Sequence, residues 1–170
     1  MTDISAEDRL TREAGAFITK QFIEIKTYSH YRMSLSDPSV KSTVLVVDAP
    51  EEALGQALLI ALAHSRFLSL EEARQIRLTG QTNYQTWIKE RMQQFRYKSK
   101  RALFRYMNHC FISSFEGRIT IRPQCHEKIE GWGRERDDGI ENVILPDTAH
   151  PSEVGAGLRL AFSRCISKIK

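Results

Sequence analysis

The pattern of apolar and polar positions marks out strands in the first third of the chain. Residues 22–25 (Phe-Ile-Glu-Ile) and residues 31–35 alternate as half-buried strands do. Residues 36–39 (Ser-Asp-Pro-Ser) have turn chemistry, because Asp and Ser bond locally to the backbone and Pro fixes φ. The segment Thr43–Val47 is β-branched and almost entirely apolar. It predicts a central strand that is buried on both faces.

Helical spacing of apolar residues dominates the middle of the chain. A first helix is predicted to begin near Pro50, where the missing N–H of proline costs nothing, with an apolar stripe over residues 54–62. A short second helix is expected to begin at Ser69 or Leu70, and residues 77–81 are expected to form a loop. Thr82 and Gln85 then fit a capping box, which opens a helix whose apolar stripe runs to Phe95.

A β-hairpin is predicted near residues 110–121. Its two alternating segments flank Phe115-Glu116-Gly117, where glycine permits a tight turn. A charged, glycine-containing loop is expected over residues 131–139, followed by a strand near 142–145 and a helix over 152–166. Together these elements predict an α/β or α+β fold, in which one domain holds a mixed β-sheet flanked by helices.

A weak internal repeat relates residues 44–62 to residues 143–162. In each segment an apolar strand leads through an aspartate and a proline to a helix with an early glycine, Gly55 or Gly155. A helical glycine costs about 1 kcal/mol relative to alanine, so its recurrence indicates close packing of both helices on a sheet. Two interpretations stay open: pseudo-symmetric halves that arose by duplication, and ordinary strand–loop–helix units that merely look alike.

The composition is that of an ordinary globular protein. The chain has 170 residues, of which 41% are hydrophobic and 27% charged, and this suits one domain with a sizeable core. No apolar run approaches the roughly 18 residues of a membrane span, and the charged N-terminus lacks the apolar core of a secretory signal. We therefore expect a cytoplasmic protein with no membrane contact. We expect a flexible leader over residues 1–14 and a single domain over residues 15–170.

The residue types that carry catalysis or bind metals show no coherent spacing. The three cysteines form no CxxC pair, and the five histidines form no HxxxH or HxH pair. Nucleophile-elbow and phosphate-loop motifs are also missing from the sequence. We expect no enzyme activity, no metal and no cofactor. One alternative stays open, namely an enzyme whose site assembles from distant residues around Tyr28, His30 and His126.

Charge is unevenly distributed, although the net charge is only +4. Residues 89–105 carry seven basic side chains and one acidic side chain, interleaved with aromatic residues. This composition supports an alternative function, a nucleic-acid-binding module that uses the 89–105 segment. The simpler interpretation is a solvated helix face, and a third is a patch that faces an acidic protein. Residues 135–153 have the opposite bias, with six acidic side chains and one basic side chain.

Several segments of the chain resemble the immunity proteins of bacterial contact-dependent growth inhibition (CDI) systems. The resemblance extends from about Phe22 to Cys165, and its main segments are YSHYRMSLSDPS, LGQALLIALAHSRFLSLEEAR, YKSKRALFRYMNHCFISS, RPQCHEKIEGW and SEVGAGLRLAFSRC. It implies a compact α/β protein that is encoded beside a large exported toxin. Such a protein would bind the toxin's C-terminal domain, often a nuclease, in a 1:1 complex. The implied mechanism is a block of the toxin's active site without turnover.

Two surfaces are candidates for toxin binding. One is the 132–141 loop, with Trp132 as an exposed anchor. Its acidic residues would face toxin cations: Glu135, Asp137, Asp138 and Glu141. The other comprises Tyr28, His30 and Tyr31, which are predicted to form an edge-strand surface of amphipathic side chains. The resemblance supplies no contact residues for either surface, because toxin and immunity sequences vary together.

Overall fold

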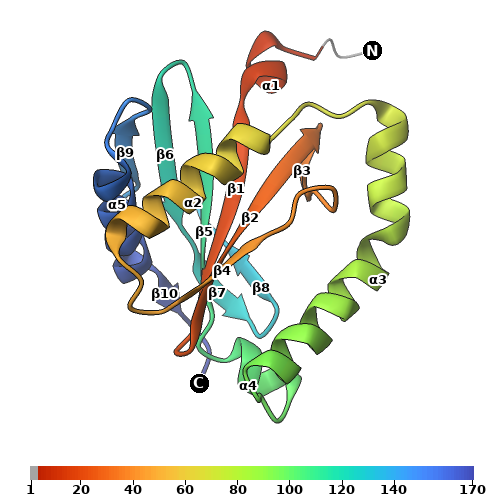
Figure 1. Cartoon of the computed structure of the whole chain (residues 1–170), viewed down its shortest axis with the longest axis vertical. Helices are drawn as coiled ribbons and strands as arrows, with labels where there is room; N and C mark the ends of the chain where they lie inside the picture. Colours follow the sequence, from red (N-terminus) through yellow and green to blue (C-terminus); the bar gives the residue numbers. More distant parts are fainter. Residues whose placement is uncertain (1–3) are drawn as a thin grey trace.

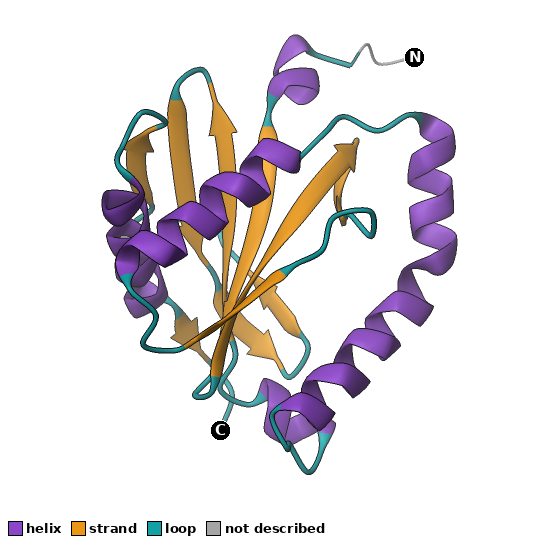
Figure 2. Cartoon of the chain, in the orientation of Figure 1, coloured by secondary structure: helices purple, strands orange, loops and turns teal. Residues whose placement is uncertain are grey.

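A seven-stranded sheet forms the centre of the protein, whose computed structural model describes residues 4–170 (Figure 1, Figure 2). The helices are α1 (Ala6–Leu10), α2 (Glu51–His64), α3 (Leu70–Gln94), α4 (Lys100–Phe104) and α5 (Pro151–Arg164). The strands of the main sheet are β1 (Arg12–Ile18), β2 (Phe22–Tyr31), β3 (Met33–Ser36), β4 (Thr43–Val46), β5 (Asn108–Phe115), β6 (Arg118–Pro123) and β9 (Val143–Pro146). A small second sheet contains β7 (Cys125–Lys128), β8 (Gly131–Gly133) and β10 (Ile166–Ser167).

The main sheet has the strand order β3-β2-β1-β5-β6-β9, and β4 pairs with the other end of the β2 edge. All of its pairings are antiparallel, and β10 with β7 is the one parallel pairing among the named strands. The predicted α+β class and the hairpin are confirmed. The hairpin joins β5 to β6 through Glu116 and Gly117, whose φ angles are 46° and 77°. Such left-handed angles at both positions suit a tight hairpin turn.

Strand β1 lies in the middle of the sheet, although its sequence does not stand out. It begins at Arg12, before the predicted end of the leader, so the folded domain starts earlier than predicted, and α1 precedes it. Residues 1–3 of that leader lie outside the described residues. The central residues of β1 have small side chains or none. Gly15 is required, because a Cβ there would lie 2.3 Å from the hydroxyl oxygen of Tyr28. Small residues weaken the apolar pattern but let a neighbouring side chain lie across the strand.

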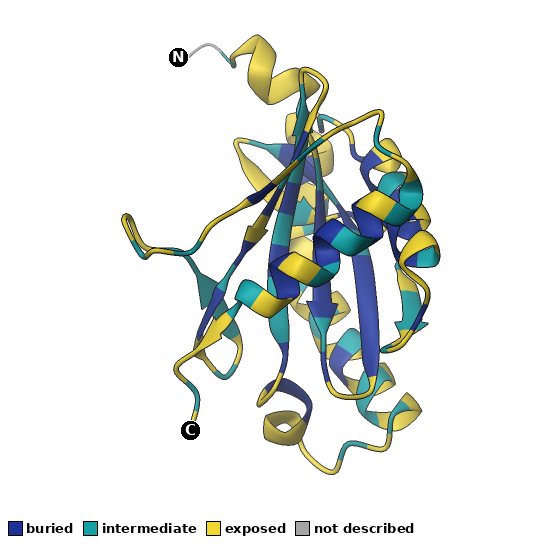
Figure 3. Ribbon diagram, turned by 90° about the vertical axis from the view of Figure 1, so that its left-hand side faces the viewer, coloured by how far each residue is buried: buried dark blue, intermediate teal, exposed yellow. Residues whose placement is uncertain are grey.

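Helices α2 and α5 cover one face of the sheet, which we call the covered face. It carries the largest apolar cluster, with contributions from β1, β2, β5 and β6: Ala14, Ala16, Ile23, Ile25, Cys110, Ile112, Ile119 and Ile121. The view turned by 90° shows buried residues concentrated in the strands and in the helix that faces them, with α1 exposed (Figure 3). Burial of this cluster is the main source of the fold's stability.

The two repeated glycines touch the opposite helix and not the sheet. A Cβ on Gly55 would lie 1.7 Å from the carbonyl oxygen of Pro151, and a Cβ on Gly155 would lie 1.7 Å from that of Glu51. The first turn of each helix therefore rests on the glycine of the other. The repeat correctly predicted close packing at the two glycines. The prediction that they pack on the sheet is wrong, because each glycine contacts the other helix.

The prediction that Thr43–Val47 forms a central strand buried on both faces is wrong. Strand β4 pairs only with β2, and Val46 is 63% exposed. The corresponding strand of the repeat, β9, likewise pairs only with β6, and Ile144 is 59% exposed. A short run of β-branched residues indicates extended backbone, but it does not indicate how many strands pair with that strand.

Helix α3 is continuous over 25 residues, so the predicted loop at 77–81 and the helix start at Thr82 are wrong. The capping box lies earlier, where Ser69 and Glu72 bond reciprocally to each other's backbone. Residues 77–79 are exposed and carry no apolar stripe, and a single glycine, Gly80, does not end a long helix. In the residues that the structure describes, no helix is both long enough and apolar enough to cross a bilayer.

Candidate functional site

The second face of the sheet, which we call the open face, carries polar residues beside a second, smaller apolar cluster that is rich in aromatic rings. Side chains alternate along a strand, so Glu24, Lys26 and Tyr28 of β2 point away from the face that buries Ile23 and Ile25. Neighbouring strands add Phe17 and His109 to this face, whose rings stack with centroids 4.4 Å apart. Helix α3 runs along this face and is fixed to it near both ends.

The C-terminal half of α3 is fixed by a buried carboxylate. Glu24 is fully buried and accepts hydrogen bonds from Trp87 Nε1 at 2.7 Å and from Arg91 Nη2 at 2.6 Å. Burial alone would raise the pKa of Glu24, but the bond from Arg91, the charge of Lys26 and a bond from Ser42 together lower it. Glu24 is therefore ionised at neutral pH and joins β2 to α3.

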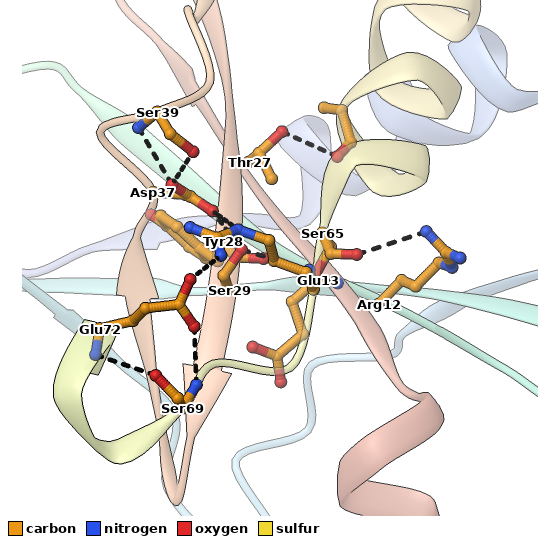
Figure 4. Close-up of polar contacts among 12 residues, drawn as sticks. Arg12, Glu13, Thr27, Tyr28, Ser29, Asp37, Ser39, Ser65, Ser69 and Glu72 are labelled. Carbon is orange, nitrogen blue, oxygen red and sulfur yellow. Dashed lines mark hydrogen bonds and ion pairs between the residues drawn. The ribbon is translucent and has the colours of Figure 1, made fainter. Parts of the chain in front are cut away.

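The N-terminal end of α3 is fixed by a network around Asp37 (Figure 4). The Asp37 carboxylate accepts from the Ser29 hydroxyl at 2.6 Å, from the Ser39 hydroxyl at 2.6 Å and from Arg66 Nε at 3.1 Å. Burial opposes its ionisation, and these bonds prevail, so the pKa of Asp37 is lowered. Arg66 also pairs with Glu72 in the first turn of α3. The network thus connects β2, the β3–β4 loop and the start of the helix.

Between these two anchors a groove separates α3 from the open face. We call it the α3 groove; it consists of two adjoining hollows of about 460 and 740 Å³. Both hollows are lined by Lys26, Ser36, Tyr84 and Trp87. Half of the residues that line the larger one carry rings: Phe17, Tyr28, Tyr84, Trp87, Phe104, His109 and Trp132. Such a concave surface, mostly apolar with a few polar groups, is typical of a binding site.

Lys26 is the cation at the centre of the groove. Its Nζ lies 3.7 Å from the ring centroid of Trp87 and 5.5 Å from that of Phe17. Within residues 4–170 it makes no hydrogen bond or ion pair. Burial lowers the pKa of Lys26 to about 8; the charge of Glu24 opposes this shift and that of Arg91 adds to it. The ammonium group is therefore largely charged at neutral pH and is held only by aromatic faces.

Tyr28 and His109 meet beside Lys26 but are poorly suited to proton transfer. The Tyr28 oxygen lies 3.3 Å from His109 Nε2. Burial raises the pKa of Tyr28 well above its usual value. Burial, assisted by the charge of Lys26, lowers the pKa of His109 to about 3, so the imidazole is neutral at physiological pH. A general acid or base needs a pKa near the working pH, and neither group has one.

Two of the predicted interface residues, Tyr28 and Trp132, come together in the larger hollow of the groove. The prediction that Trp132 is exposed is wrong. Its ring is half-buried in β8, its Nε1 donates to the carbonyl of Met107 at 2.8 Å, and it stacks on His126 with centroids 4.8 Å apart. Trp132 is thus a wall of the groove and not a projecting anchor.

The acidic residues of the 132–141 loop lie mostly in internal ion pairs. Asp138 is held by Arg134 at 2.5 Å, which with a bond from Ile140 N lowers the pKa of Asp138 to about 2. The other pairs are looser: Glu135 with Lys168 at 3.6 Å and Glu141 with Arg164 at 3.7 Å. Asp137 is exposed and, among the described residues, has no ion-pair partner. The loop is therefore less free to meet toxin cations than its composition indicates.

The prediction that Tyr28, His30 and Tyr31 form an edge strand is wrong, because β2 has neighbours on both sides. His30 is 5% exposed, contacts the carbonyl of Asp8 through Nε2 and lies 3.8 Å from Glu13. Tyr31 is half-buried with its ring 5.9 Å from that of Phe67. The alternation of apolar and polar residues predicted a strand correctly, but it does not indicate whether that strand lies at the edge of the sheet.

The alternative functions receive little structural support. His126 is buried and bonds through Nε2 to the carbonyl of Ile129, so it does not join His30 or Tyr28 in a catalytic group. No cluster of three metal-binding side chains occurs within residues 4–170. The basic 89–105 segment is divided by internal contacts, because Arg91 pairs with Glu24 and Lys100 pairs with Glu130 at 2.9 Å.

Sequence reasoning missed the polar pair at the heart of the groove. Glu24 and Lys26 interrupt the apolar beginning of the strand, where Phe22, Ile23 and Ile25 stand, and a charge at such a position must find a partner or a function. That interruption was a usable signal. The partner helix was not foreseeable, because Trp87 and Arg91 lie more than sixty residues further along the chain.

Comparison with known proteins gives concordant results. The family model for the CDI immunity protein matches residues 12–165. The chain is 37% identical to the immunity protein CdiI-YPIII of Yersinia pseudotuberculosis serotype O:3 (strain YPIII), over 89% of this chain and 94% of that protein. A chain of the CdiA-CT/CdiI toxin and immunity complex from Yersinia pseudotuberculosis superimposes with a TM-score of 0.80 at 36% identity, covering 91% of this chain and 97% of that one.

A second solved structure agrees with the first. The protein of unknown function NMB0488 from Neisseria meningitidis superimposes with a TM-score of 0.79 at 30% identity. The match covers 95% of this chain and 99% of that one. The similarity therefore extends over nearly the whole chain and not only over a shared core.

Proposed function

The chain belongs to the CDI immunity protein family, and from that membership we propose that it binds and neutralises the C-terminal toxin domain of its cognate growth-inhibition effector. The observation that carries the proposal is the near-complete match to a chain of a solved toxin and immunity complex. The complex would be 1:1 and would form in the cytoplasm of the cell that makes both proteins. Inhibition would follow from occupancy of the toxin and would need no turnover.

The toxin is proposed to be a nuclease whose active site is covered in the complex. Nucleases hold phosphate with cationic side chains, so an inhibitor that presents carboxylates gains association rate from charge complementarity. The 132–141 loop is one candidate surface for that contact, with Asp137 as the acidic residue that has no ion-pair partner within residues 4–170. The α3 groove is the other.

The test starts from the toxin domain encoded beside this chain. Co-expression should protect cells from growth arrest, and the two proteins should co-elute as a 1:1 complex whose mass is measured by light scattering. Cleavage of cellular RNA and of plasmid DNA by the toxin, followed on gels, should stop at one equivalent of this protein. A toxin domain from an unrelated system serves as the control and should be neither bound nor inhibited. Failure to bind the neighbouring toxin would contradict the proposal.

A further inference from the structure

The charges that line the α3 groove are not balanced. Its two carboxylates are already engaged: Asp37 is held by Arg66, and Glu130 is held by Lys100 and by the Tyr84 hydroxyl. Two lining cations, Lys26 and Arg77, have no ion-pair partner within residues 4–170. Arg77 is exposed at the rim, and Lys26 is half-buried at the floor. Among the described residues the groove therefore presents one cation without an ion-pair partner at its rim and another at its floor.

The N-terminal half of the helix that forms the outer wall makes few core contacts, whereas its C-terminal half packs Ile88, Tyr84 and Trp87 into a second apolar cluster. Only Ala73 and Ile88 are buried among its 25 residues. Ile76, Gly80, Asn83, Tyr84 and Trp87 face the smaller hollow. The two anchors at Asp37 and Glu24 hold the helix at its ends and keep the groove open between them. Rigid supports around a hollow, partly apolar surface are what a preformed binding site requires.

We propose that the α3 groove is where the toxin docks, and that its occupant is an acidic side chain of the toxin, inserted so that its carboxylate pairs with the ammonium of Lys26. This inference rests on the proposed toxin-binding function and specifies its site. The carboxylate replaces the water that Lys26 loses on burial, and its methylene groups lie against Trp87 and Phe17. Arg77 at the rim steers the acidic segment inward.

Other occupants fit the groove less well. A toxin arginine or lysine would be repelled by Lys26, and the buried Glu24 carboxylate is already committed to Arg91. A purely apolar side chain would cover the rings but leave a buried ammonium with no partner, which costs more than a hydrogen bond contributes. An acidic side chain satisfies both the rings and the charge.

The first experiment measures the Kd for the neighbouring toxin domain with Lys26→Met. This change keeps the volume of the side chain and removes its charge. Truncating one partner of a desolvated pair costs at least about 2 kcal/mol, so the Kd should rise about 30-fold or more, mainly through faster dissociation. The matched control is Lys98→Met, at an exposed lysine outside the groove, which should change the Kd by less than about threefold. Equal Kd values for both variants would overturn the inference.

A second measurement varies the toxin. The toxin's Asp and Glu residues are changed singly to Asn and Gln, and the Lys26 ammonium is followed by ¹⁵N NMR in each complex. One toxin change should weaken binding as much as Lys26→Met does, and its effect should vanish in the Lys26→Met background. A toxin extended by a short Gly-Ser tail should bind normally, because the C-terminal carboxylate is not the group inserted. Absence of any toxin residue coupled to Lys26 would contradict the inference.

Different results would contradict the proposed function and the proposed docking site. If the parent protein does not bind the neighbouring toxin at all, the proposed function is wrong. If the parent binds and protects while Lys26→Met binds equally well, the function stands and the groove is not the docking site. Thermal melting of each variant confirms that a change in Kd reflects the contact and not unfolding.

Discussion

The two faces of the main sheet are packed in different ways. On the covered face, helices α2 and α5 lie so close that Gly55 and Gly155 touch backbone carbonyls of the opposite helix, and the core between helices and sheet is aliphatic. On the open face, α3 is held at its ends, and the space beneath it contains rings, a buried ion pair and a lone ammonium. The first face is organised for stability. The second carries charges that stability alone does not explain.

The largest effect on stability should come from a substitution at the close contact between α2 and α5 on the covered face. Gly55→Ala places a methyl group where the Pro151 carbonyl oxygen lies, at 1.7 Å, so the two helices must separate. We expect a loss of more than about 4 kcal/mol in the free energy of unfolding, measured by urea denaturation.

The matched control is the same substitution on the other side of the molecule. Gly80→Ala in α3 meets no atom within 4 Å, and alanine is the better helix former, so stability should rise by about 1 kcal/mol. The same change would thus have opposite signs on the two faces. Similar losses for both variants would show that the faces are not packed differently.

The next effect concerns the carboxylate that fixes α3. Glu24→Gln leaves the largely buried Arg91 with only the exposed Glu90, 4.0 Å away, as a charged partner, and we expect a loss of about 3 kcal/mol at pH 7. The pKa of Glu24 is below its ordinary value of 4.5 in the folded protein, so its contribution is complete above that pH and is lost as the pH falls further. The gap in stability between parent and variant, followed by denaturation at a series of pH values, should therefore narrow below about pH 4.5. A gap that is constant down to pH 3 would contradict the role given to Glu24.

Lys26→Met should raise stability while it weakens toxin binding. The pKa of Lys26 is about 8 in the folded protein and 10.5 ordinarily, so the unfolded chain binds the proton more tightly. The charged ammonium therefore costs stability at neutral pH, and that cost declines as the pH rises from 8 towards 10.5. The difference between the two pKa values corresponds to at most about 3 kcal/mol; with solvent screening of this half-buried group we expect a gain of about 1 kcal/mol at pH 7, which disappears as the pH approaches 10.5. A variant that loses both stability and affinity would indicate a structural lysine.

The smallest effect is expected at the acidic loop. Glu135→Lys with Asp137→Lys spares Asp138, which the loop needs to hold Arg134 and the amide of Ile140. Both changed positions are exposed, so stability should stay within about 0.5 kcal/mol. Association with the toxin, followed by stopped-flow fluorescence, should slow modestly and lose part of its salt dependence, with the Kd within about threefold. A loss of 30-fold or more would make this loop the principal interface.

The covered face was more accessible to sequence reasoning than the open face. Helix α2, helix α5 and the β5–β6 hairpin follow from local patterns: apolar stripes, a proline at the helix start and a glycine turn. The repeat even pointed to the two glycines of the helix contact. Strand β1 was missed because its core is Ala14-Gly15-Ala16, where small residues replace the usual β-branched signal.

The open face depends on contacts that no local pattern records. Lys26 and Trp87 belong to different elements, and their contact requires α3 to run unbroken past Gly80, where the sequence predicted a loop. Trp132 was identified as important, but its role changed from exposed anchor to groove wall once β8 paired with β7. Tertiary contacts decide such positions, and single-sequence patterns carry no information about them.

The most direct test of the account is a crystal structure of this protein with the toxin domain encoded beside it. We expect the toxin to lie over the α3 groove, with the carboxylate of an Asp or Glu side chain within about 3 Å of Lys26 Nζ, between the rings of Trp87 and Phe17. The groove would be filled and α3 would hardly move. A complex in which the toxin contacts the 132–141 loop or another surface and leaves the groove open to solvent would contradict the account.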